Sequence, residues 1–222
     1  MIMGKENNLT DFLTDIADAI REKKGSSEKV NPQDFASEIR SIEGGGETTE
    51  VYVFGETMID AGGGVHTVKK VRVADGVQKV GGYRGNYSIE YIEIPDSVSV
   101  IVSTAFYGMA SLKELVLPEA VSAISASMCY NCVALERVEC KGNIVQIYGS
   151  SLSYCGIMNE LLMTNNTVVP TLRAVNALGY NPCKIVIPDN LYDEWITATN
   201  WVSYGPEGSN QIVKASEYNQ NE

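Results

Sequence analysis

Apolar side chains recur every 23 residues through the middle of the chain, with the order L-x-x-L-x-L inside each period. The last two apolar positions alternate with outward positions, as a β-strand with one buried face requires. Three sets of residues stand one period apart: Ile89, Leu112, Leu135 and Met158; Ile92, Leu115, Val138 and Leu161; Ile94, Leu117, Cys140 and Met163. The pattern therefore predicts a stack of similar coils, each contributing one short strand to a parallel sheet.

The remainder of each period predicts how a coil closes. Pro95-Asp96 follows the strand and favours a turn, because proline lacks a backbone donor. Val98 and Ile101 then return the chain to the core on the far side of the coil. In the compact turn that follows, Gly108 and Asn131 occupy the same position, and both residue types tolerate the left-handed conformation.

Repeats of this length and core are typical of a leucine-rich repeat solenoid, which we expect over residues 68–188 as part of an α+β repeat fold. Its first unit follows a less regular 21-residue step. Residues 189–222 are expected to form a C-terminal cap with a helix that carries Trp195. We interpret Trp195 and Trp201 as sealing the open end of the solenoid; the alternative is that they are binding aromatics.

The pattern of residues 1–46 predicts a different element: a hairpin of two short amphipathic helices, which we expect to anchor the chain. The apolar stripes at helical spacing are Leu9, Leu13, Ile16 and Ile20 in the first helix, and Phe35, Ile39 and Ile42 in the second. Residues 47–67 predict a glycine-containing linker and an entry strand. Because the two stripes bury little surface within one hairpin, we expect them to pack against another chain. The alternative is a cap folded back on the first repeat.

The charge of the chain narrows the classes of partner. Its net charge of −11 at pH 7 argues against nucleic acid, which selects a basic surface, and against anionic membranes. No uncharged apolar run is long enough for a transmembrane helix, so we expect no membrane insertion. The first residues contain no apolar segment like that of a secretory signal peptide, which predicts folding in a reducing cytoplasm.

The five cysteines are either a redox or metal-binding motif or apolar packing residues. Cys129-x-x-Cys132 has the spacing of a redox motif or of half a zinc site. Packing is the favoured interpretation, because Cys129 shares its position with Phe106 and Leu152 and because the chain's only histidine lies in an earlier segment. Cys132 and Cys155 stand one repeat apart, which leaves a disulfide open. We expect five free thiols, no metal and no cofactor.

Enzymatic activity is not expected. No Ser/His/Asp or Cys/His set is apparent, and carboxylate pairs such as Glu136 and Glu139 need a cleft that raises one pKa before they serve as acid and base. The outward face of a solenoid provides no such cleft.

The outward positions of the strands predict the surface of the solenoid. Three rows are expected: Glu90, Lys113, Glu136 and Asn159; Tyr91, Glu114, Arg137 and Glu160; Glu93, Val116, Glu139 and Leu162. Opposite charges on neighbouring strands should neutralise the first two rows. The third row mixes carboxylates with exposed apolar groups and is the better binding candidate. On the turn edge, Tyr107 and Tyr130 align one repeat apart. Two interpretations stay open: the pair contacts a sugar or a protein, or it only covers the edge of the coil.

Two resemblances add to these inferences. Residues 89–155 resemble BspA-type leucine-rich repeats of gut and oral bacteria, as in Ile94-Pro95-Asp96-Ser97-Val98 and in Ala105-Phe106-Tyr107-Gly108-Met109-Ala110-Ser111-Leu112. The chain departs from that pattern at Met109 and Met128, where Cys and Ala are usual. The ending Ile187-Pro188-Asp189-Asn190-Leu191 is similar to the closing unit of those proteins. Ile16-Ala17-Asp18-Ala19-Ile20-Arg21-Glu22-Lys23, followed by Asn31-Pro32-Gln33-Asp34-Phe35, resembles N-terminal segments of phage and prophage tail-associated proteins.

These resemblances imply one of two functions. The first is a virion-associated structural or adhesion protein, assembled in the host cytoplasm, in which residues 1–46 contact virion proteins or sister copies. Its repeats would display a surface to a host receptor or glycan. The second is a bacterial interaction module, on the cell surface or in the cytosol, with no connection to a phage.

Overall fold

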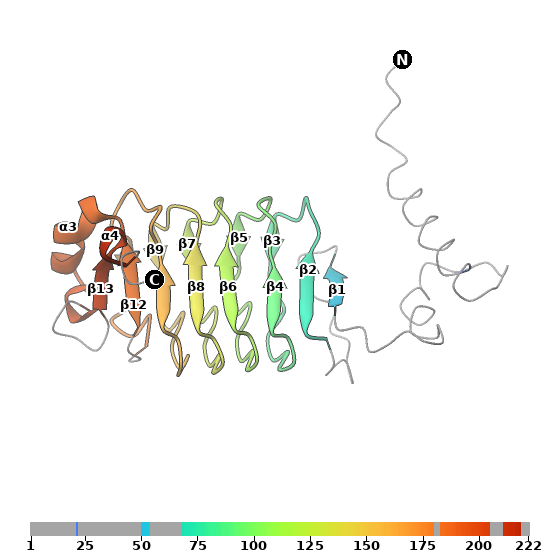
Figure 1. Ribbon diagram of the computed structural model, residues 1–222. Helices are drawn as coiled ribbons and strands as arrows, with labels where there is room; N and C mark the ends of the chain where they lie inside the picture. Colours follow the sequence, from blue (N-terminus) through green and yellow to red (C-terminus); the bar gives the residue numbers. More distant parts are fainter. Residues whose placement is uncertain (1–20, 22–49, 54–67, 180–182, 205–210, 219–222) are drawn as a thin grey trace, which may run out of the picture. The chain divides into compact units, whose positions relative to one another are not determined.

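The computed structural model describes residues 21, 50–53, 68–179, 183–204 and 211–218 (Figure 1). The chain divides into two units, Met1–Thr48 and Thr49–Glu222, and all described residues except Arg21 belong to the second. The expected helical hairpin of residues 1–46, with its anchor candidates, lies outside the described residues.

A parallel sheet of eight strands runs along the whole of the second unit, one strand for each coil (Figure 1). Its strands, in spatial order, are β1 (Glu50–Val53), β2 (Lys70–Val73), β4 (Tyr91–Glu93), β6 (Glu114–Leu117), β8 (Arg137–Cys140), β10 (Glu160–Leu162), β12 (Lys184–Ile187) and β13 (Gln211–Lys214). Residues one period apart are paired, as in Leu115 with Val138. In the irregular first unit, with its 21-residue step, Val71 is paired with Ile92. The solenoid and its register are therefore confirmed.

Each coil crosses the core a second time on the opposite side. The short strands there are β3 (Lys79–Val80), β5 (Val100–Ile101), β7 (Ala123–Ile124), β9 (Gln146–Ile147) and β11 (Thr171–Leu172). The apolar second residue of each is buried, so the expected return of the chain at Ile101 is confirmed. Apolar side chains from both sides fill the space between the two rows of strands.

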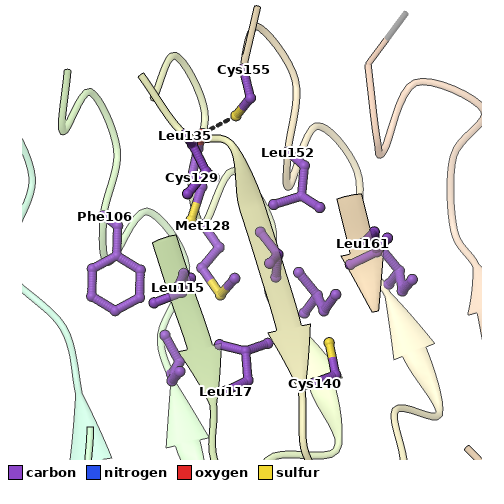
Figure 2. Close-up of a cluster of buried hydrophobic side chains, with 14 of the residues drawn as sticks. Phe106, Leu115, Leu117, Met128, Cys129, Leu135, Cys140, Leu152, Cys155 and Leu161 are labelled. Carbon is purple, nitrogen blue, oxygen red and sulfur yellow. Dashed lines mark hydrogen bonds between the residues drawn. The ribbon is translucent and has the colours of Figure 1, made fainter. Parts of the chain in front are cut away.

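The core contains the residues that the 23-residue pattern assigns to it. Leu115, Leu117 and Leu161 from the large sheet belong to one apolar cluster with Met128 from the turn, and all four side chains are inaccessible to solvent (Figure 2). One coil has too little apolar surface to form such a core alone, because each side chain packs between its own coil and the next.

The compact turns depend on a left-handed residue at one repeated position. Gly108 has φ +69° and Asn131 has φ +61°, which confirms the conformation expected for both. Gly85 and Tyr154 continue the same column with φ +74° and +62°. In this conformation the amide group points along the stack, so Gly108 N donates to Tyr130 O at 2.8 Å and Asn131 N to Ser153 O at 2.9 Å. Each turn is thereby joined to the next coil.

The last coil continues into η2 (Asp189–Leu191), α3 (Tyr192–Thr197) and η3 (Val202–Tyr204) before β13 and α4 (Ala215–Tyr218). Trp195 and Trp201 are completely buried and pack edge to face at 5.2 Å between ring centroids. The indole of Trp201 donates to Pro170 O at 2.7 Å. Neither ring is therefore open to a ligand. Within the described ranges, none of the helices has the length and apolar character needed to cross a bilayer.

Candidate interaction surface

Ion pairs cover the outward face of the large sheet. Glu90 lies between Lys69, at 3.1 Å, and Lys113, at 2.6 Å. The hydrogen bond from Lys113, followed by that from Lys69, lowers the pKa of the Glu90 carboxyl. The expected pairing of opposite charges in the first row is confirmed for Glu90 and Lys113.

Two strands further along, Arg137 is a cation that lies among carboxylates. Its guanidinium is 3.1 Å from Glu139, 3.7 Å from Glu114 and 3.8 Å from Glu160. Opposite charges on neighbouring strands are thus paired in the second row as well, although one guanidinium faces two carboxylates of that row. Because these groups are partly exposed to solvent, each pair contributes little to stability.

The third row differs from its prediction. Glu93 pairs with Lys70 at 2.8 Å and with Arg72 at 3.0 Å, while Glu139 accepts a hydrogen bond from Arg137. The binding candidates Glu93 and Glu139 are thus tied to cations of their own sheet. Val116 is half-buried.

Leu162 is not an exposed contact residue, and that expectation is wrong. Only 7% of its surface is accessible. Leu162 pairs in register with Val186 on β12, against which α4 packs. The hydroxyl of Tyr218, in α4, donates to Glu160 at 2.7 Å. The C-terminal segment therefore passes over this end of the sheet, and the repeat pattern has no equivalent of that segment.

The turn edge brings the two predicted tyrosines into contact. The rings of Tyr107 and Tyr130 are stacked, 5.1 Å between centroids and 9° between planes. Tyr154 adds a third ring, 5.0 Å from Tyr130 and tilted by 55°, and the Arg84 guanidinium lies 4.5 Å from the centre of Tyr107. We call Tyr107, Tyr130 and Tyr154 the tyrosine ladder.

The sequence prediction missed Tyr154 and Arg84. Tyr154 stands 24 residues after Tyr130, one place off the repeat, where Ser153 falls. The column of left-handed residues contains the signal that could have identified it, since Tyr154 occupies the place of Gly108 and Asn131.

The geometry of the ladder limits what it can bind. Arg84 from the preceding coil and Tyr130 from the following coil cover the faces of Tyr107, and its two neighbours in the ladder cover Tyr130. A sugar ring stacks on an aromatic face, so these two tyrosines present mainly their edges and hydroxyls. Partial desolvation and the neighbouring Tyr154 raise the pKa of Tyr130. The arrangement suits a protein contact better than sugar stacking.

Three segments of the chain around the ladder carry no charged side chain, and Arg84, which lies over Tyr107, comes from the coil before them. Residues 97–112, 120–135 and 142–159 contain no Asp, Glu, Lys or Arg. Each segment leaves the large sheet, crosses the opposite side, forms the turn and returns. We call the turn-side part of these three coils the neutral edge; it includes the tyrosine ladder and the exposed Val133 and Ile157.

All five cysteines are buried and free. Cys132 Sγ donates to Phe106 O at 3.0 Å and Cys155 Sγ to Cys129 O at 3.1 Å, so both thiols bond to the backbone of the preceding coil. Phe106, Cys129 and Leu152 share a buried column, which confirms the packing interpretation. Within the described parts of the chain, no three or more His, Cys, Asp or Glu side chains are grouped so that they could hold a metal ion.

Thiol titration should separate the native from the unfolded chain. Burial raises the pKa of Cys155 and of Cys183 to about 12, so near pH 8 their thiols stay protonated and inaccessible. We expect a disulfide-exchange reagent to react slowly or not at all with the native protein. It should titrate five thiols under denaturing, non-reducing conditions. A value of three would indicate one disulfide.

Comparison with solved structures finds leucine-rich repeat proteins of low similarity to this chain. The solved structure of a leucine-rich repeat protein from Eubacterium ventriosum has 20% identity and a TM-score of 0.35, over 75% of this chain and 33% of that one. The T. pallidum leucine-rich repeat protein TpLRR has 17% identity and a TM-score of 0.38, over 67% and 82% of the two chains. The chain thus spans about one third of the length of the Eubacterium protein. No curated protein matches it.

The family described as BspA type leucine rich repeat region matches residues 68–191 in six copies. This match covers more than half of the chain and includes the strands and turns that build both the core and the neutral edge. The chain therefore belongs to the BspA-type leucine-rich repeat family.

Proposed function

We propose that the chain is a non-enzymatic structural or adhesion protein in the virion of a gut bacteriophage or prophage, as a tail or fibre component. Residues 1–46 attach it to the particle, and the solenoid displays a surface for contact with a protein or glycan. The attachment half of the proposal is supported by the resemblance of segments 16–23 and 31–35 to tail-associated proteins.

The observation that carries the display half of the proposal is the tyrosine ladder on the neutral edge. Leucine-rich repeat domains generally mediate protein contacts, and a solenoid provides extended surfaces for them. Contact surfaces are enriched in tyrosine and depleted of charge at their centres. Tyr107 and Tyr130 are therefore the first binding candidates. Glu93, Val116 and Glu139 on the strand face come second, because the two carboxylates are already paired.

The alternative is a BspA-like bacterial interaction module, on the cell surface or in the cytosol, without a phage. Family membership supports this alternative as well as it supports the first proposal. The neighbouring genes distinguish the two: capsid and tail genes favour the virion, whereas a transport or surface locus favours the bacterial module.

Deleting residues 1–46 should abolish attachment to particles and leave the solenoid folded. The physical reason is that two short amphipathic stripes bury little surface in one hairpin and need a partner. Co-sedimentation with particles measures attachment, and circular dichroism with thermal unfolding checks that the truncated chain is folded. A truncated chain that binds particles as the full chain does would leave residues 1–46 as a cap and remove the support for attachment.

A further inference from the structure

We propose that the neutral edge is a surface through which two copies of this chain associate, with Tyr154 at its centre. This contact rests on the display half of the proposed function, because it names a second copy as the protein partner of the same edge. It uses a surface other than residues 1–46, so it holds or fails independently of particle attachment.

Tyr154 is the first reason. It adopts a left-handed backbone with φ +62°, in a column whose other members include Gly85, Gly108 and Asn131. A bulky residue rarely adopts this conformation, because its side chain crowds the backbone. Its side chain is also 65% exposed, so packing within the chain recovers little of that cost. The turn requires the left-handed backbone at this position but not a tyrosine side chain, and strained residues cluster at functional sites.

The distribution of charge is the second reason, and it indicates a second copy as the partner. The chain has a net charge of −11, so two copies carry charge of the same sign and repel one another overall. The carboxylates of the repeat region, such as Glu93 and Glu136, lie on or beside the large sheet, while segments 97–112, 120–135 and 142–159 have none. The neutral edge is therefore a side through which two acidic chains can approach without bringing carboxylates together, and its nearest charge is the Arg84 guanidinium over Tyr107.

The chemistry of the edge is the third reason, because it complements itself. A tyrosine hydroxyl both donates and accepts a hydrogen bond, so the ladder of a second copy satisfies the ladder of the first. Exposed Val133 and Ile157 each follow the ladder tyrosine of their coil by three residues and add exposed apolar area to the edge. A two-fold axis through the edge would place the same residues on both sides of the contact, as in most homodimers.

The substitution Tyr154→Asn separates a role in association from a role in folding. Asparagine tolerates the left-handed conformation, as Asn131 does in the preceding coil. We expect the midpoint of thermal unfolding, measured at concentrations where the chain is monomeric, to be unchanged or higher. The dissociation constant of the dimer should rise about tenfold or more. Sedimentation equilibrium of the full chain measures it.

The control is Val202→Asn, which places the same residue at an equally exposed apolar position in η3, outside the edge. It should leave association unchanged. Raising the salt concentration should not weaken the contact either, because no ion pair forms in it. Assembly through residues 1–46 alone would be insensitive to Tyr154→Asn.

The inference is overturned by a wild-type chain that stays monomeric, by a Tyr154→Asn chain that associates as the wild type does, or by equal weakening of association by Val202→Asn. A fall in both the unfolding midpoint and association of the Tyr154→Asn chain would make Tyr154 a structural residue and would also overturn it. Loss of association with the unfolding midpoint maintained supports it. None of these results depends on whether the chain binds particles.

Discussion

Replacing Leu115 with alanine should lower the free energy of unfolding by about 2–5 kcal/mol. Leu115 is completely buried on β6, in register with Val138 of the next coil, so its loss leaves a cavity between two coils (Figure 2). Chemical denaturation followed by circular dichroism measures the change.

Val116→Ala is the matched control, because Val116 lies on the same strand with its side chain outward and half-buried. We expect it to cost about 1 kcal/mol or less. If the two substitutions cost the same, or if Leu115→Ala costs nothing, the register of the large sheet is wrong.

Replacing Gly142 with alanine should cost about 3 kcal/mol or more, by overpacking two neighbouring coils. A Cβ atom at Gly142 would lie 2.1 Å from the backbone oxygen of Glu119, one repeat earlier. A carbonyl held in the backbone cannot rotate away as a side chain does, so the coils must separate. Thermal or chemical unfolding measures the loss.

Gly149→Ala provides the comparison. There the added Cβ would meet only the Cβ of Ala174 at 3.6 Å, an ordinary contact. We expect a change of less than about 1 kcal/mol in either direction. Equal effects at Gly142 and Gly149 would show that the coils are not packed as closely as the structure places them.

The repeat core was predictable because its signal is periodic. Leu115 and its equivalents recur at a fixed step, and stacking buries the apolar side chain that each coil places at the same inward position. The left-handed turn at Gly108 and Asn131 was predictable for a similar reason, since residue type and position agree. The ion pairs around Glu90 follow from the pairing of neighbouring strands.

Features that break the period were not predictable. Leu162 has the outward position of its row, but α4 and Tyr218 arrive over it from a segment without repeat character. Tyr154 is one place out of step with Tyr130, so alignment by period hides the third ring of the ladder. Gly142 carries no special φ angle; its importance comes from the close approach of Glu119, which only the three-dimensional packing reveals.

Particle attachment is the central claim of the proposed function, and mass spectrometry of fractionated cultures tests it most directly. Particles induced from the bacterium that carries the gene would be purified on a density gradient and compared with envelope and cytosol fractions. We expect the chain in the particle fractions, at a constant ratio to capsid and tail proteins across the gradient. Recovery in the envelope or cytosol, with none in the particles, would contradict the virion proposal and favour the bacterial interaction module.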